Sequence, residues 1–249
     1  MKHNKRLGQN FLSDKRILQK IIGAGELSPS DTVLEIGPGT GNLTKLLAEK
    51  AKKVIAVEKD PRLVEFLKVK FCDHKNIQII HGDILKPTTY HLTPTTCYKI
   101  IANIPYYITS RFLKNSLTAI PKPKLMVLMV QYEVAKRITA RPGEMNLLAL
   151  SVQIFGKPKI IAKIPRHYFH PSPQVDSAII KITDISDKRL KDNDMKEEKL
   201  FPFLKKAFGQ KRKTLRKSLG IKNLPEKYSS ARPEELSLED WVVLARQFS

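Results

Sequence analysis

A glycine-rich segment at residues 37–41 constrains the fold of this chain more than any other feature. It reads Gly-Pro-Gly-Thr-Gly and lies between an apolar run at Thr32–Ile36 and a helical pattern at Asn42–Lys50. Glycine lets the backbone adopt strained angles and approach a ligand closely. A strand, a glycine turn and a helix in this order are typical of α/β folds that bind a ligand at the turn. A tight structural turn without a ligand is the alternative.

The spacing of these glycines favours one class of site over another. A dinucleotide-binding fold prefers G-x-G-x-x-G, with phosphate at the helix N-terminus. This chain has G-x-G-x-G, and Asn42 occupies the place of the last glycine. The spacing therefore disfavours a nicotinamide-dependent oxidoreductase.

Strand and helix patterns alternate beyond this turn. Ser13 is expected to cap a helix over Asp14–Ile22 that ends at Gly23 and Gly25. The further strands are expected at Lys53–Val57, Ile77–Ile80, Tyr98–Ala102, Lys124–Val130, Ile160–Ile164 and Ser177–Ile182, with helices from Pro61 and over Ser110–Ala119. This alternation predicts an α/β domain with a mostly parallel sheet covered on both faces.

The composition changes near residue 186. Nine of the thirteen residues in Ser186–Glu198 are charged, which is typical of a linker or domain boundary. Short helices are expected at Leu200–Phe208, Lys211–Leu219 and Ser237–Phe248. We therefore predict two domains: residues 1–185 as the α/β domain and residues 186–249 as a small helical domain.

Two acidic residues follow the second and third expected strands. Glu58 lies 21 residues after Gly37 and can accept hydrogen bonds from both hydroxyls of a ribose. Asp83 follows Gly82 and can bond an adenine amine. Each acid alone is typical of a solvated turn. Ligands bind at the carboxyl ends of strands in such sheets. The glycine turn, Glu58 and Asp83 follow three successive expected strands, and together they favour a site for a nucleoside-containing cofactor.

The tetrapeptide Asn103-Ile104-Pro105-Tyr106 follows the fourth expected strand. An exocyclic amine of a nucleobase is a poor nucleophile, and two fixed acceptors, the side-chain oxygen of Asn103 and the carbonyl of Pro105, would favour a more reactive nitrogen. Tyr106 can stack on the ring, as flipped bases commonly require. Together with the glycine turn, this predicts an S-adenosylmethionine-dependent methyltransferase acting on such an amine. An Asx turn before proline is the alternative.

A second aromatic candidate is Phe169, which could stack on the other face of the base. A core phenylalanine before the loop that begins at Pro171 explains the same residue. The choice between the two stays open at this point.

The charge of the chain points to a polyanionic partner. Its net charge is +21, and nucleic acid is the usual partner of so basic a protein. Residues 201–219 carry seven basic side chains and no acidic one, and they offer a phosphate-contacting face: Lys205, Lys206, Lys211, Arg212, Lys213, Arg216 and Lys217. A solvated helix is the alternative.

Other classes find little support. Cys72 and Cys97 form no CxxC pair, and His167 and His170 have no further ligand cluster near them, so no metal site is predicted. No apolar run reaches the ~18 residues of a membrane span. The basic N-terminus lacks the apolar region of a signal peptide, and a cytoplasmic location is expected.

The motifs together resemble one family over almost the whole chain. They are Leu7–Leu12, Glu35–Gly39, Asn103–Tyr106, Phe169–Ser177 and Phe208–Leu219. In combination they resemble the KsgA family, the adenine dimethyltransferases of small-subunit ribosomal RNA. Two stretches depart from the pattern of bacterial relatives: Gln131–Val134, which contains Tyr132, and Pro142–Asn146.

The resemblance implies a Rossmann-like methyltransferase domain, a helical domain that contacts rRNA, and a monomer. It implies that Gln9, Asn10 and Leu12 help to close over the methionine part of S-adenosylmethionine, that Gly37 and Gly39 line the glycine loop, and that Asn103 touches both cofactor and target. The activity expected from it is dimethylation of N6 of two adjacent adenosines in a hairpin loop near the 3′ end of small-subunit rRNA, with a role in ribosome biogenesis.

Two alternatives stay open. Erm-type large-subunit rRNA adenine methyltransferases share the catalytic motifs, although Phe208–Leu219 resembles the small-subunit family. A non-catalytic ribosome-binding factor on the same fold is the other, and the intact Asn103–Tyr106 segment disfavours it.

Overall fold

The computed structural model describes residues 9–86, 97–210 and 212–248. It consists of two compact units: residues 1–135 with 159–185, and residues 136–158 with 186–249. One division falls between residues 185 and 186, where the composition changes. The sequence did not indicate that residues 136–158, expected in the first domain, group with the C-terminal helices.

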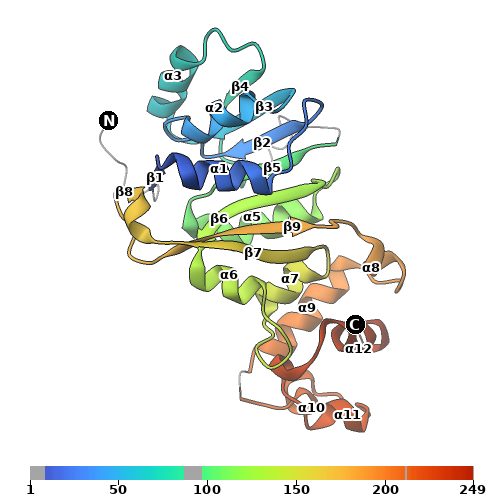
Figure 1. Ribbon diagram of the computed structural model, residues 1–249. Coiled ribbons are helices and arrows are strands. Elements are labelled where there is room, and N and C mark those ends of the chain that lie inside the picture. The colour runs from blue at the N-terminus through green and yellow to red at the C-terminus, as the bar shows by residue number, and fades with distance from the viewer. Residues whose placement is uncertain (1–8, 87–96, 211, 249) are drawn as a thin grey trace. The chain divides into compact units, whose positions relative to one another are not determined.

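A seven-stranded sheet organises the first unit. Its order is β4 (Ile77–His81), β3 (Lys53–Glu58), β2 (Thr32–Ile36), β5 (Lys99–Asn103), β6 (Leu125–Gln131), β9 (Ser177–Thr183) and β7 (Lys157–Ile164), as Figure 1 shows. The pairs β3–β4, β2–β3, β2–β5 and β5–β6 are parallel, and β9 runs antiparallel to β6. The predicted mostly parallel sheet is confirmed.

Helices cover this sheet on both faces because its strands are apolar on both. Helices α1 (Lys15–Ala24) and α2 (Asn42–Ala48) pack their buried leucines and isoleucines against Val33, Ile101 and Val127. The alternate strand residues, such as Ile100 and Met126, are equally buried. Helix α3 (Pro61–Lys70) and helix α5 (Thr109–Thr118) follow β3 and β5, and α5 lies behind the sheet in Figure 1.

The start of α1 differs from the prediction. Asp14, not Ser13, caps this helix, and its carboxylate accepts hydrogen bonds from the N–H groups of Arg16 and Ile17. Aspartate and serine are nearly equal as N-caps, so sequence alone does not separate neighbours. Gly23 lies inside the helix and Gly25 ends it.

A two-stranded ribbon was not predicted. Strand β1 (Phe11–Leu12) pairs antiparallel with β8 (Phe169–His170), which follows a short 3-10 helix at Arg166–Tyr168. The two strands are 157 residues apart in the chain, counted from Leu12 to Phe169. Two-residue strands carry no periodicity, so this pairing has no local signal.

The second unit is helical. Its helices are α7 (Leu147–Gln153), α8 (Lys188–Lys191), α9 (Glu197–Phe208), α10 (Leu215–Leu219), α11 (Glu226–Ser229) and α12 (Leu238–Phe248), and α6 (Tyr132–Ile138) crosses the division between the units. Aromatic rings build its core. Trp241, which is 1% exposed, lies 5.2 Å from Phe208 and 6.3 Å from Phe203 between ring centroids.

Two predictions for this region were wrong in part. The charged stretch Ser186–Glu198 is no free linker, because Arg189 donates to the carbonyls of Gln153 and Ile154 and Leu190 is buried. The expected helix Lys211–Leu219 is shorter, since α10 begins at Leu215. Among the described residues, no helix is both long and apolar enough to cross a membrane.

Candidate active site

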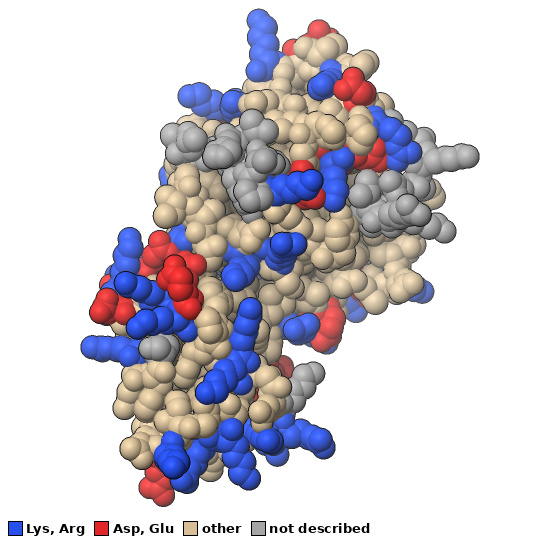
Figure 2. Space-filling model, turned by 180° about the vertical axis from the view of Figure 1, so that it is seen from behind, with Lys and Arg blue, Asp and Glu red and all other residues tan. Residues whose placement is uncertain are grey.

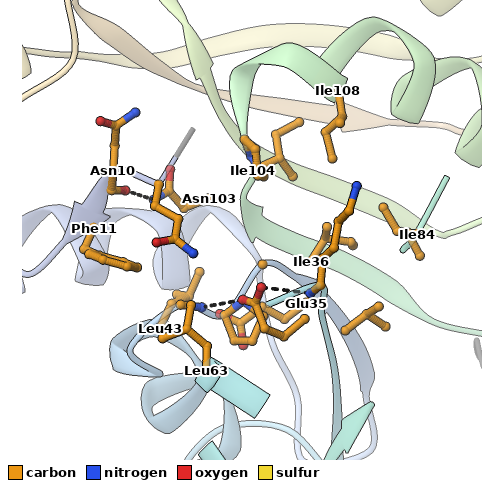
Figure 3. Close-up of a pocket in the computed structure, with 18 of the residues that line it drawn as sticks. Asn10, Phe11, Glu35, Ile36, Leu43, Leu63, Ile84, Asn103, Ile104 and Ile108 are labelled. Atoms are coloured by element: carbon orange, nitrogen blue, oxygen red, sulfur yellow. Dashed lines mark hydrogen bonds between the residues drawn. The ribbon is translucent and has the colours of Figure 1, made fainter. Parts of the chain in front are cut away.

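A pocket opens at the carboxyl ends of β2, β3 and β5. Its empty volume is about 980 Å³, open solvent included, which suits a cofactor-sized ligand. Figure 3 shows Asn10, Phe11 and Asn103 on one side of it and Ile84 and Ile108 on the other. Every predicted cofactor residue lines it: Gln9, Asn10, Leu12, Gly37, Gly39, Glu58, Asp83 and Asn103.

The glycine loop fills one wall of the pocket. Gly37, Gly39 and Gly41 have φ angles of +65°, +59° and +78°, a region that side chains rarely adopt. A Cβ on Gly39 would lie 2.9 Å from the ring of Phe11. Glycine is therefore required at this position by backbone angle and by space.

Glu58 is held rigidly at the end of β3. Its carboxylate accepts hydrogen bonds from the N–H groups of Gly39 (3.3 Å), Lys59 (2.8 Å) and Asp60 (2.9 Å). Burial raises the pKa of Glu58, and these three hydrogen bonds oppose that shift. A carboxylate has about four lone-pair positions, so acceptor capacity remains for a ligand hydroxyl.

Asp83 is paired with a neighbour that no sequence pattern indicated. Lys59 Nζ lies 2.9 Å from Asp83 Oδ2, and the N–H of Leu85 donates to Oδ1. Partial burial acts to raise the pKa of Asp83, but the hydrogen bonds and charge of its neighbours, Lys59 first among them, outweigh it and the pKa is lowered. Asp83 is thus an ionised acceptor at the pocket wall, with Lys59 beside it.

Glu35 is a further pocket residue, to which the motifs alone assigned no role. It is 1% exposed, and among the described residues its Oε2 atom has no hydrogen-bond partner. Burial, and less strongly the charge of Glu58, raises the pKa of Glu35 to about 8. The Thr44 side chain beside this carboxyl opposes the shift. A buried carboxyl oxygen without a partner is costly, so Oε2 marks a place where a cationic or hydrogen-bonding ligand group fits.

Three side chains tie the N-terminal segment over the glycine loop. Gln9 Nε2 donates to Asp60 Oδ2 (3.1 Å), Asn42 Nδ2 donates to the Leu12 carbonyl (3.1 Å), and Asn103 Nδ2 donates to the Asn10 carbonyl (3.1 Å). Asp60 is itself held by Arg62, whose hydrogen bond lowers the pKa of Asp60 to about 2. The segment is therefore one wall of the pocket.

Asn103 is the last residue of β5 and its amide has a fixed orientation. Because Nδ2 donates to the Asn10 carbonyl, Oδ1 is left as an acceptor (Figure 3). The Pro105 carbonyl accepts the N–H of Ile108 at 3.2 Å and keeps a second lone pair. Asn103, Pro105 and Tyr106 all line the pocket, so the predicted acceptors and ring are gathered at one site.

Tyr106 is anchored through its hydroxyl, which lies 2.6 Å from the Ser177 hydroxyl. Burial raises the pKa of Tyr106. The anchored hydroxyl fixes the position of the ring, which a stacking platform needs.

Phe169 lies in the apolar core of the first unit. It is 4% exposed and packs in the core with Leu12, its partner across the β1–β8 ribbon. It is also not among the residues that line the pocket. The core role is the one that the structure supports, because in this ribbon register the ring faces the apolar cluster.

The basic residues of 201–219 belong to the second unit. Those that the structure describes are all exposed: Lys205, Lys206, Arg212, Lys213, Arg216 and Lys217. Lys211 lies outside the described residues. Figure 2 shows Lys and Arg spread over one face of the molecule, with Asp and Glu in a few smaller groups.

Comparison with known proteins decides the family. A family model described as ribosomal RNA adenine dimethylase matches residues 1–240. The chain belongs to the ribosomal RNA adenine dimethylase family. The resemblance seen in the motifs is thereby confirmed.

Named relatives and solved structures are similar to this chain over almost its whole length. A Dehalococcoides mccartyi protein named ribosomal RNA small subunit methyltransferase A is 42% identical over 263 residues, covering 100% of this chain and 89% of the relative. A dimethyladenosine transferase from Plasmodium falciparum has a TM-score of 0.83 at 29% identity, covering 96% and 97%. The 23S rRNA methyltransferase ErmE has a TM-score of 0.75 at 27% identity, covering 96% and 99%. The Rossmann-like fold is confirmed.

Proposed function

We propose that this chain transfers methyl groups from S-adenosylmethionine to N6 of adenine in small-subunit ribosomal RNA, producing dimethyladenosine. The observation that carries the proposal is the geometry of Asn103. Its amide nitrogen is engaged by the Asn10 carbonyl, so its oxygen is presented as an acceptor in the pocket that Glu58 and Asp83 also line. The names of the relatives support the same reaction.

The pocket suits S-adenosylmethionine on three independent features. The unpartnered Oε2 of Glu35 fits the ammonium group of the methionine part. Glu58 suits the ribose hydroxyls and Asp83 the adenine amine, because both are acceptors at strand ends. When bound, the cofactor supplies a methyl group on a positively charged sulfur.

The chain's own groups would then align the target amine. In the first transfer, Asn103 Oδ1 and the Pro105 carbonyl would accept hydrogen bonds from the two N–H groups of N6, which would direct the nitrogen lone pair toward the methyl group. In the second transfer, the one N–H group that remains would occupy one of these two acceptors. Tyr106 holds the ring of an unstacked base. Because the methyl group would depart from a sulfur that is already positively charged, alignment of the amine contributes more than a general base, and the proton released from N6 would pass to water.

The finer features of the substrate rest on the resemblance. The target would be two adjacent adenosines in a hairpin loop near the 3′ end of the rRNA, methylated during small-subunit biogenesis in the cytoplasm by a monomeric enzyme. The basic residues of the second unit would contact rRNA phosphates. The Erm-type alternative is less well supported, since the identity to ErmE is 27% against 42% for the small-subunit relative.

Substitution of Asn103 tests the proposal. Asn103→Ala should lower the rate of single-turnover methyl transfer by about 10²–10³-fold, as removal of one fixed transition-state hydrogen bond does elsewhere. Binding of S-adenosylmethionine, measured by titration calorimetry, should stay measurable but become weaker, because the variant also loses the hydrogen bond to the Asn10 carbonyl. Asn103→Asp keeps an acceptor but loses the bond to the Asn10 carbonyl, and it should transfer at an intermediate rate. Near-normal turnover by Asn103→Ala would refute the assignment.

A further inference from the structure

Tyr107 is an exposed aromatic side chain at the pocket, and the methyl-transfer chemistry above does not use it. It is 58% exposed and is one of the residues that line the pocket. Among the described residues, its hydroxyl has no hydrogen-bond partner. A large aromatic ring left in water at the mouth of a binding site is typical of a surface that a ligand covers.

The backbone around Tyr107 is rigid. Tyr107 is the middle residue of a 3-10 helix, Tyr106–Ile108, that follows Pro105. Ile104 is 1% exposed and Ile108 is 6% exposed, so the residues on either side are anchored in the core. The Tyr106 carbonyl also accepts a hydrogen bond from Thr109 Oγ1 at 3.0 Å. The ring of Tyr107 is therefore presented from a fixed platform, which lowers the entropy cost of stacking on it.

Among the described residues, Tyr107 is the one exposed aromatic side chain that lines the pocket. Phe169, the second aromatic expected from the motifs, is buried in the core. Of the described Phe, Tyr and Trp side chains, Tyr107 and Phe66 are the two exposed by more than a third, and Phe66 does not line the pocket. Tyr107 is thus the exposed ring beside the target site.

We propose that Tyr107 stacks on the RNA base next to the target adenine. This neighbouring base stays outside the pocket, while the target adenine enters it. This rests on the proposed function. The exposed half of the ring faces solvent rather than an enclosed subsite, which fits a base at the mouth. Lys59, whose side chain is 48% exposed and whose ammonium group is paired with Asp83, lies in the same pocket wall.

The test measures binding of a labelled RNA hairpin whose loop carries two adjacent adenosines, by fluorescence anisotropy with S-adenosylhomocysteine present. Tyr107→Ala should weaken binding by about 5- to 150-fold, the range that stacking on one base supplies. Tyr107→Phe, which keeps the ring, should bind within about twofold of wild type. Phe66→Ala, which removes an exposed ring outside the pocket, should not change the affinity.

Abasic hairpins identify the base. Replacement of one of the two adenosines by an abasic nucleotide should abolish the difference between wild type and Tyr107→Ala, because the stacking partner is gone. The inference fails if Tyr107→Ala binds the intact hairpin as wild type does, if its effect survives both abasic substitutions, or if it weakens S-adenosylhomocysteine binding by the same factor, which would assign the ring to the cofactor.

The proposed function fails in a different measurement. A wild-type enzyme that binds the hairpin or the small subunit but transfers no methyl group would count against methyl transfer. The hairpin affinities of the Tyr107 variants could still be compared in that case, since RNA binding does not need methyl transfer.

Discussion

At the scale of single residues, Glu35 is a buried carboxyl in the pocket that a cationic ligand group would stabilise in its ionised form. Its carboxyl is fully buried, its Oε2 atom has no partner among the described residues, and burial raises its pKa to about 8 from an ordinary value of 4.5. Without a ligand the group therefore holds a proton at neutral pH. A cationic group placed beside it would favour the ionised form.

The raised pKa of Glu35 makes a prediction about stability. Between pH 4.5 and about 8 the folded protein keeps a proton on Glu35 that the unfolded chain has lost, so stability falls as the pH rises through this window. Glu35→Gln removes that loss. Without cofactor the variant should be more stable than wild type at pH 8 and close to wild type at pH 4.5. Each tenfold difference between the ionisation constants of the folded and unfolded states corresponds to about 1.4 kcal/mol.

Urea unfolding of both proteins at the two pH values checks this prediction. The same variant should bind S-adenosylmethionine more weakly, since a neutral amide replaces the counter-charge of the ammonium. An equal stability difference at both pH values would show that Glu35 does not titrate with a raised pKa.

The sequence predicted the residues of the site better than their contacts. Glu58, Asp83 and Asn103 were predicted to meet at one edge of the sheet because each lies at or just after the end of an expected strand, and all three line the pocket. The ion pair between Lys59 and Asp83 was missed, because a lysine after a strand has no distinctive spacing. Phe169 was ambiguous because its environment depends on a ribbon partner far away in the chain.

At the scale of elements, β1 is a wall of the pocket that pairs with β8 and also accepts hydrogen bonds from side-chain amides. Asn42 donates to the Leu12 carbonyl from the start of α2, and Asn103 donates to the Asn10 carbonyl from the end of β5. A two-residue strand has few hydrogen bonds of its own. The position of β1 therefore depends on these amides.

Asn42→Ala should weaken S-adenosylmethionine binding by about 5- to 10-fold, because one hydrogen bond contributes about 1 kcal/mol and its loss loosens β1. Asn76→Ala is a matched control, since Asn76 Nδ2 donates to the carbonyls of Ala48 and Ala51 away from the pocket. It should cost similar stability and leave cofactor affinity unchanged. Equal cofactor affinity in both variants would mean that β1 needs no tie from Asn42.

Most of the longer elements were predicted within about two residues of their ends because their periodicity is strong, and β2 (Thr32–Ile36) was predicted without error. Strand β7 and helix α9 each begin three residues before the predicted start. Three kinds of element were missed: the β1–β8 ribbon, the helices α6 and α7, and the short helices α8 and α11. Strands of two residues and helices of four have too few positions for a period. Helix Leu147–Gln153 is buried on most of its surface, so its sequence lacks the alternation of apolar and polar faces by which a helix is recognised.

At the scale of the whole molecule, a net charge of +21 predicts RNA binding that depends strongly on salt. The exposed residues Lys213, Arg216 and Lys217 of the second unit are the candidates for phosphate contacts. Replacing all three by Gln should reduce the slope of log affinity against log salt by about 2–3, since each phosphate contact contributes about 0.7–0.9.

A matched triple variant distinguishes contact from net charge. Lys50, Lys52 and Lys53 are also exposed and belong to the first unit, where Lys50 and Lys52 lie between α2 and β3 and Lys53 is the first residue of β3. Their replacement by Gln removes the same charge and should change the slope little. If the two triple variants lower the slope equally, the basic residues of α10 and the preceding turn make no specific contact.

The division of the molecule illustrates a limit of reading a chain in order. A shift in composition marked residue 186, but residues 136–158 join the second unit through contacts such as those of the Gly143 and Met145 N–H groups with the Glu234 carbonyl. Their partner lies about ninety residues further along the chain, and composition carries no signal of such a pairing.

The central claim is methyl transfer to adenine of small-subunit rRNA, and the most direct test offers undermethylated small and large ribosomal subunits separately, with labelled S-adenosylmethionine. The modified nucleoside is then mapped by primer extension and mass spectrometry. We predict N6,N6-dimethyladenosine at two adjacent positions near the 3′ end of small-subunit rRNA and none in the large subunit. Label in the large subunit, or in neither subunit while the cofactor binds, would contradict it.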